Sequence, residues 1–125
     1  MAWISGNVAD DFSDDGRSFF RSKLPYQRVD GVVVANNFTE LTSSQGIISP
    51  ILIDQYGNGV QGSPDTWTGE PRDPSRFGDN CSNWTEGGFA SGTTGDRRQA
   101  GPFWDVNGST ECFVPNHLYC FEQPE

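Results

Sequence analysis

Residues 69–101 read GEPRDPSRFGDNCSNWTEGGFASGTTGDRRQAG, a run made mostly of Gly, Ser, Thr, Asp, Asn and Arg. This composition predicts loop rather than helix or regular strand. A loop region of that length inside a compact domain is normally either functional or cross-linked. Cys81 lies within the run. The sequence therefore predicts a long loop, from Gly69 to Gly101, that is held by a disulfide and can present a ligand-binding surface.

The chain has three cysteines, Cys81, Cys112 and Cys120. An odd number permits at most one internal disulfide, and three pairings are possible. A zinc site is not favoured, because no two cysteines have the C-x-x-C spacing and His117 is the only histidine. Catalysis by a thiol is not favoured either, since that histidine would have to serve as the base. The cysteines therefore indicate one disulfide and one thiol without a partner in the chain.

Length and charge restrict the class of protein. The 125 residues fit one domain, 1–125. The formal charge of −9 opposes binding to phosphate backbones, so we expect no nucleic-acid partner. The longest apolar runs are much shorter than the roughly 20 residues that cross a bilayer, and residues 2–5 do not begin a signal peptide. We therefore expect no membrane insertion, and an acidic surface of the kind that is common on secreted proteins.

Local signals predict short strands, short helices and many turns. Asp30-Gly31 lies between apolar residues in the segment 26–35, which is typical of a β-hairpin. Asn36 or Asn37 can cap a short helix that ends near Leu41. Further strands are expected at 2–5, 51–53, 66–68 and 117–121. Because aliphatic residues are few, the tryptophans Trp67, Trp84 and Trp104 are expected to form much of the core.

Short motifs occur along the whole chain in the order of a known family. They are Ala2-Trp3-Ile4-Ser5, Pro25-Tyr26, Val29-Asp30-Gly31, Val34-Ala35, Asn37-Phe38, Leu41-Thr42, Pro50-Ile51, Trp67-Thr68-Gly69-Glu70-Pro71, Cys81, Trp84-Thr85, Trp104-Asp105, Cys112 and Leu118-Tyr119-Cys120-Phe121. The second half resembles the C-type-lectin-like fold. The whole chain is similar to an endostatin-related bacterial family of extracellular lectin-like domains.

This resemblance implies an α+β, C-type-lectin-like fold with small twisted antiparallel sheets, few short helices and a long disulfide-stapled loop region. It implies a Cys81–Cys112 disulfide, with Cys120 unpaired or bonded to another chain. Domains of this family begin with a strand and a cysteine-bearing helix, so we expect 1–125 to be an N-terminally truncated domain. The missing segment would normally cover one side of the sheet, and a second copy of the chain could cover that side in a homo-oligomer. The resemblance places the protein outside the cell or at the cell surface.

The resemblance also supplies candidate ligand-binding residues. Glu70-Pro71-Arg72 and Trp104-Asp105 stand where calcium-dependent lectins hold their ion, which gives Glu70, Arg72, Asp73, Trp104 and Asp105. Calcium needs six to eight oxygen ligands, and Arg72 replaces one of them with a cation. We therefore expect no cofactor. The alternative is a calcium site made by Glu70, Asp73 and Asp105.

The function expected from these features is non-catalytic binding of an extracellular protein or glycan through the long loop region. One alternative is a calcium-dependent carbohydrate-binding lectin domain, and another is a hydrolase on a lectin-like scaffold. The chain has none of the G-x-S-x-G, H-E-x-x-H or phosphate-loop motifs. We therefore expect that it is not an enzyme.

Overall fold

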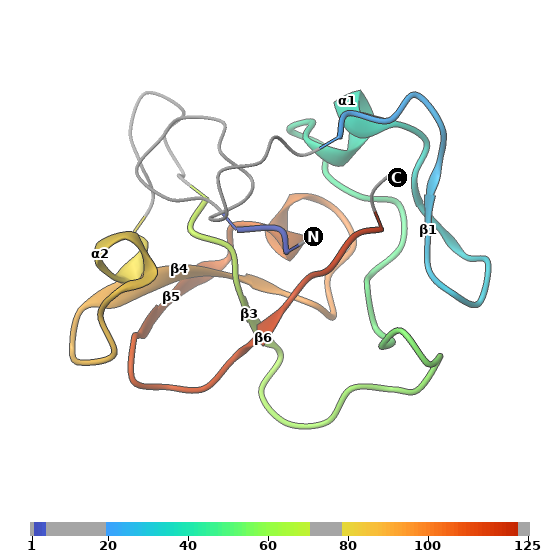
Figure 1. Cartoon of the computed structure of the whole chain (residues 1–125). Helices are drawn as coiled ribbons and strands as arrows, with labels where there is room; N and C mark the ends of the chain where they lie inside the picture. The colour runs from blue at the N-terminus through green and yellow to red at the C-terminus, as the bar shows by residue number, and fades with distance from the viewer. Residues whose placement is uncertain (1, 5–19, 71–78, 123–125) are drawn as a thin grey trace. The chain divides into compact units, whose positions relative to one another are not determined.

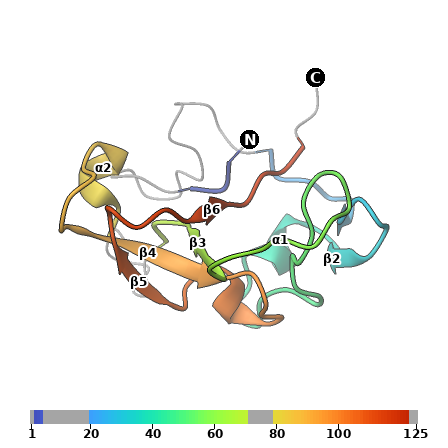
Figure 2. The same cartoon turned by 90° about the horizontal axis from the view of Figure 1, so that it is seen from below.

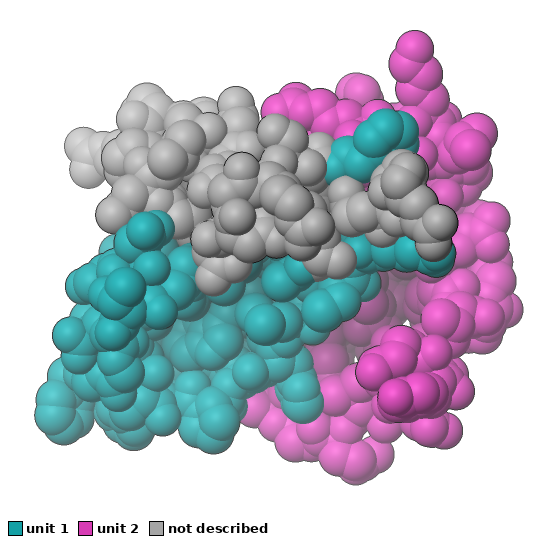
Figure 3. Space-filling view, in the orientation of Figure 1, with its two compact units in different colours: residues 1–20, 65–95, 105–125 teal, residues 21–64, 96–104 magenta. Residues whose placement is uncertain are grey.

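The computed structural model describes residues 2–4, 20–70 and 79–122. The chain divides into two compact units, of which unit 1 comprises residues 1–20, 65–95 and 105–125, and unit 2 comprises 21–64 and 96–104. Figure 3 distinguishes the two units by colour. The described residues form small antiparallel and mixed sheets, short helices and one disulfide, so the α+β class is confirmed at that level.

Unit 2 begins with the hairpin that the sequence predicts. Strands β1 (Tyr26–Gln27) and β2 (Val33–Ala35) pair antiparallel, and the Arg28 N–H donates to the Val32 carbonyl at 2.9 Å. Gly31 occupies the turn with a φ of 87°, a value that glycine adopts without steric cost. The Arg28 guanidinium bonds to the Asp30 carboxylate at 2.6 Å. This bond closes the turn and lowers the pKa of Asp30.

Helix α1 (Phe38–Leu41) follows the hairpin, and the side chains of Asn37 and Glu40 hold its N-terminal end. The Asn37 side chain accepts from the Glu40 N–H at 2.9 Å, and the Glu40 carboxylate accepts from the Asn36 N–H at 3.0 Å. The first bond satisfies an amide that the first turn of the helix leaves unpaired, and the second holds the residue that precedes the cap. Phe38 and Leu41 are buried. The predicted short helix is confirmed, with Asn37 as its cap.

The strand expected at 51–53 does not form. Ile53 makes only an isolated bridge to Gly59, because the chain turns back immediately after it. The Asp54 carboxylate accepts from the amides of Tyr56 and Asn58, each at 2.9 Å, and this fixes the turn. Aspartate favours such turns since its short side chain reaches nearby amides. The remaining element of unit 2 is the 3₁₀ turn η1 (Pro102–Trp104).

Unit 1 contains a four-stranded sheet with the order β5-β4-β3-β6 (Figures 1 and 2). Its strands are β3 (Asp65–Trp67), β4 (Ser91–Asp96), β5 (Gly108–Glu111) and β6 (His117–Leu118); the last residue of β4 falls in unit 2. Strands β4 and β5 pair antiparallel, whereas β3 and β6 pair parallel. The strand predicted at 66–68 corresponds to β3, which has the same length but begins one residue earlier, and the strand predicted at 117–121 corresponds to β6, which is shorter.

Strand β4 contradicts the expectation of a continuous loop from Gly69 to Gly101. Its sequence, SGTTGD, lacks any large apolar residue, yet Thr93 and Thr94 are buried. The strand is stable because its polar groups find partners: the Thr93 hydroxyl accepts from the Asp79 N–H, and the Thr93 carbonyl accepts from the Thr68 N–H. The predicted loop is wrong here because small polar residues can form a buried strand when other segments supply hydrogen-bond partners for them.

The disulfide joins α2 (Cys81–Trp84) to the residue that follows β5. Cys81 and Cys112 are bonded, with their Cα atoms 5.8 Å apart, and this is the pairing that the resemblance implied. Strand β4 passes beside the bond at Gly92. A Cβ atom there would lie 2.9 Å from the Cys81 sulfur and 2.7 Å from the Trp67 ring. Glycine is therefore required for the close approach. Cys120 carries a free, exposed thiol.

Removing the disulfide is expected to destabilise the fold strongly. The bond closes a loop of 31 residues. The chain-entropy model assigns about 3–4 kcal/mol to such a loop. We predict that the double variant Cys81→Ser/Cys112→Ser loses that much free energy of unfolding in urea titrations. The matched control, Cys120→Ser, should unfold at the wild-type urea concentration. Equal midpoints for the double variant and the wild type would contradict the prediction.

Candidate functional site

The backbone groups of two of the predicted acidic site residues, Glu70 and Asp105, meet in unit 1 at the hydroxyl of Thr68. That hydroxyl donates to the Asp105 carbonyl at 2.6 Å and accepts from the Glu70 N–H at 3.4 Å. Thr68 has no exposed surface, so this junction is internal. Thr68 directly follows β3, and the strand therefore positions Glu70 against the segment that begins at Asp105.

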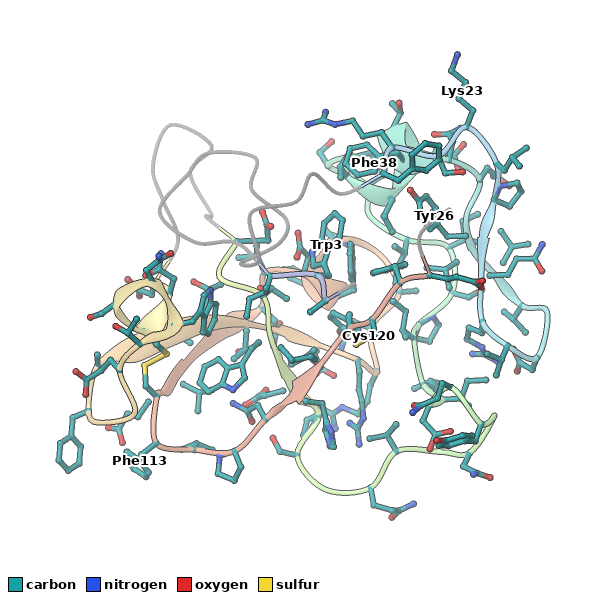
Figure 4. The ribbon with its side chains drawn as sticks, viewed as in Figure 1. Trp3, Lys23, Tyr26, Phe38, Phe113 and Cys120 are labelled. Carbon is teal, nitrogen blue, oxygen red and sulfur yellow. A yellow bond between two sulfur atoms is a disulfide. The ribbon has the colours of Figure 1, made fainter. Side chains whose placement is uncertain are left out.

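The Asp105 side chain is held by the N-terminal segment. The indole N–H of Trp3 donates to Asp105 Oδ1 at 2.8 Å, and the Trp3 ring is fully buried. Residues 2–4 are held in turn by the C-terminal segment, since the Trp3 N–H donates to the Tyr119 carbonyl at 2.8 Å and Ala2 bridges to Cys120. The Trp3 ring also meets Phe121 edge-on. Figure 4 shows the Trp3 side chain.

Burial raises the pKa of the Asp105 carboxyl to about 7, and the hydrogen bond from Trp3 opposes that rise. Near neutral pH this carboxyl is therefore protonated in part of the molecules. Calcium binds the ionised carboxylate, and one of the two oxygens already accepts from Trp3. Asp105 is thus better suited to holding a proton than to holding a cation.

The other predicted ligand-binding residues do not join this junction. Arg72 and Asp73 lie outside the described residues. Trp104 lies in unit 2 and is 2% exposed, so its ring belongs to the core and offers no surface to a ligand. Among residues 2–4, 20–70 and 79–122, no group of three His, Cys, Asp or Glu side chains is arranged to hold a metal ion.

The raised pKa of Asp105 gives stability a pH dependence of known sign. The carboxyl keeps its proton up to about pH 7 in the folded chain, whereas its ordinary value is 3.8. Between those values the folded state binds more protons than the unfolded state, so this group's contribution to stability falls as the pH rises. Asn is neutral at every pH. We therefore predict that the free energy of unfolding of Asp105→Asn, relative to that of wild type, rises by on the order of 2 kcal/mol between about pH 5 and about pH 8.

Thermal melts at several pH values measure this gain. The control Glu111→Gln removes an exposed carboxylate of the same unit and should not reproduce this gain. If the difference in stability between Asp105→Asn and wild type is constant across the pH range, Asp105 is ionised in the folded chain and the prediction is wrong.

A second candidate site is a pair of exposed phenylalanine rings, Phe89 and Phe113, which we call the ring pair. The two side chains belong to residues that are 85% and 53% exposed. Their ring centroids are 5.5 Å apart at an interplanar angle of 73°, the edge-to-face geometry that aromatic rings prefer. Figure 4 shows Phe113 in the turn between β5 and β6, with its side chain directed outward.

The segments that carry the ring pair are bonded to each other. The Cys112 N–H donates to the Ala90 carbonyl at 2.7 Å, and the Phe113 N–H donates to the Gly88 carbonyl at 3.1 Å. Cys112 is also half of the disulfide. Hydrogen bonds and the disulfide therefore fix the backbone that carries both rings. Because this backbone is already ordered, ligand binding costs little further conformational entropy.

Helix α2 supports this surface in an unusual backbone conformation. All four of its residues, Cys81 to Trp84, have φ between 53° and 64°, which makes the element a left-handed turn. L-residues pay about 1–2 kcal/mol each for this conformation. The disulfide at Cys81 holds one end, and the Trp84 ring packs edge-on against Trp67 at 5.8 Å at the other. Strain of this kind is maintained only where the surrounding structure imposes it.

Relieving the strain in α2 should stabilise the chain. Ser82 is exposed and has a φ of 53° and a ψ of 54°. Glycine adopts these angles freely, so we predict that Ser82→Gly raises the free energy of unfolding by about 0.5–1 kcal/mol. Ser82→Ala keeps a Cβ atom and should show no gain. Urea titration of both variants tests this, and a glycine variant less stable than the alanine variant would refute the left-handed turn.

No sequence pattern predicted the ring pair. Phenylalanine normally predicts core, and nothing in Gly87-Gly88-Phe89 or Cys112-Phe113 shows that both rings face solvent. Their only distinguishing feature is proximity to a glycine pair and to a cysteine. Exposure of large apolar side chains in a group is informative, because such groups on a folded surface mark interaction sites.

A scan against protein-family models found no match to this chain, and searches of curated proteins and of solved structures found none either. None of the described helices has the length and apolar character needed to cross a membrane. The disulfide is typical of proteins that work in an oxidising environment.

Proposed function

We propose that this chain is a non-catalytic binding module that works outside the cell or at its surface. It recognises a protein or a glycan, and it does so through the ring pair. We propose further that its fold is C-type-lectin-like and that it belongs with the endostatin-related domains. The motif order along the sequence supports that assignment, as does the Cys81–Cys112 bond, which is the pairing those domains would have.

The observation that carries the proposal is the exposure of Phe89 and Phe113 on a fixed support. Two phenylalanines in water leave a large apolar area uncovered, and covering one such side chain is worth roughly 1.5–3 kcal/mol. Folding alone does not recover this free energy, because the rings contact each other and still remain exposed. A partner that covers both rings would recover it.

The same part of the molecule supports the proposed location outside the cell. The disulfide holds α2 and the Phe113 turn, so reduction would release the support of the ring pair. Disulfides persist in secreted and cell-surface proteins and are rare where thiols are kept reduced. A binding surface that depends on a disulfide is therefore suited to the outside of the cell.

The calcium-dependent lectin is the second candidate, because the Thr68 hydroxyl bonds to the backbone of both Glu70 and Asp105. The pKa of about 7 at Asp105 counts against it, since a partly protonated carboxyl is a weak calcium ligand. The same group would be the natural acid of a hydrolase. Its bond to the buried Trp3 holds one oxygen away from any substrate.

The proposal predicts that binding depends on the ring pair and does not depend on calcium. Wild-type protein and Phe89→Ala/Phe113→Ala are applied to arrays of extracellular polysaccharides and matrix polypeptides, in calcium and in EDTA. The control is Phe103→Ala, which removes a ring of unit 2 from a residue that is 53% exposed, as Phe113 is. We expect signals on one class of probe that survive EDTA and the control substitution and disappear in the double variant.

Two results would contradict the proposal. One is a wild-type array with no bound probe, and the other is a double variant that binds as the wild type does. Signals that vanish in EDTA would favour the calcium-dependent lectin instead. Because both rings are exposed, the double variant should fold, and an unchanged circular dichroism spectrum with one reactive thiol verifies that it has.

A further inference from the structure

The negative charge of this protein is concentrated in one unit. Unit 1 contains thirteen of the 17 Asp and Glu residues but three of the eight Lys and Arg residues, which gives it a formal charge of −10. Unit 2 contains the other four acidic and five basic residues and has a charge of +1. The whole negative charge of the chain therefore belongs to the unit that carries the ring pair.

The described residues of unit 1 include several acids and no Lys or Arg. Residues 65–70, 79–95 and 105–122 include no Lys or Arg, and Arg72 and Arg76 lie outside the described ranges. Glu86 and Glu111 are exposed. Glu86 accepts from the Gly88 N–H at 2.8 Å, which holds its carboxylate beside the segment that leads to Phe89. Glu111 directly precedes Cys112, and Phe113 follows.

Exposed aromatic rings in an acidic unit favour one class of binding partner over the others. A neutral glycan would use the rings but not the surrounding carboxylates. A second copy of the chain would bring two units of charge −10 together, which is repulsive. A cationic polypeptide uses both features, because a guanidinium group stacks on aromatic faces and pairs with carboxylates.

We propose that the ring pair docks an arginine-rich polypeptide segment. Guanidinium groups lie on the faces of Phe89 and Phe113, and Glu86 and Glu111 pair with their charge. This inference rests on the proposed function and names the chemical class of the partner. Arginine is preferred over lysine, because its planar group stacks on a ring while it still donates hydrogen bonds to a carboxylate.

The test measures fluorescence polarisation with three labelled peptides that alternate serine with arginine, lysine or citrulline. Citrulline keeps the planar shape of arginine and removes the charge. We expect the arginine peptide to bind more tightly than the lysine peptide, the citrulline peptide to bind least, and the affinity to fall as salt is added. Loss of both rings in Phe89→Ala/Phe113→Ala should weaken binding of the arginine peptide about tenfold.

Two further variants separate the rings from the charges. Glu86→Gln/Glu111→Gln should weaken binding about threefold and reduce the salt dependence, since each exposed ion pair contributes little. Phe103→Ala, the control in unit 2 at a residue as exposed as Phe113, should bind as the wild type does.

Three outcomes would overturn the inference. They are equal binding of the arginine and lysine peptides with no effect of the ring substitutions, tightest binding of the citrulline peptide, and no binding of the arginine peptide at low salt. If any of these occurs while array signals still depend on the ring pair, the inference fails and the proposed binding function stands. If the array signals are also independent of the rings, both fail.

Discussion

The disulfide between Cys81 and Cys112 is the constraint on which the rest of unit 1 depends, because it ties a left-handed turn to the end of a strand. Without it, four residues with positive φ would have to keep that conformation through one aromatic contact and a few hydrogen bonds. With it, the turn is fixed above Gly92, where the missing side chain allows the sulfur to approach. The ring pair then projects from backbone that the bond has already ordered.

A chain with few aliphatic residues compensates with polar interactions in its interior. Thr66, Thr68, Thr93 and Thr94 are all buried in unit 1, and three of them form bonds that join neighbouring segments. Unit 2 uses Arg97 in the same way, since this buried guanidinium donates to the Val60 carbonyl at 2.7 Å. Buried polar groups are stable when each finds a partner, and they make the fold depend on exact placement.

Features that depend on neighbouring residues were predictable from the sequence. The hairpin at Asp30-Gly31 and a cap at Asn36 or Asn37 were predicted, because a turn or a cap is decided within a few residues. The strand β4 was missed, because its stability comes from Asp79 and Thr68, which are distant in sequence. The resemblance named Glu70 and Asp105 as candidate ligand residues, but it did not predict that the Thr68 hydroxyl bonds to the backbone of both. Exposure of Phe89 and Phe113 depends on what the tertiary fold leaves uncovered, and no local pattern encodes it.

Disulfide mapping tests the central claim most directly. The protein is alkylated without reduction, digested, and the linked peptides are identified by mass spectrometry. The structure predicts one linked pair, containing Cys81 and Cys112, and an alkylated Cys120. A linked pair that contains Cys120, with either Cys81 or Cys112 alkylated in its place, would show that the support of the ring pair has been assigned wrongly.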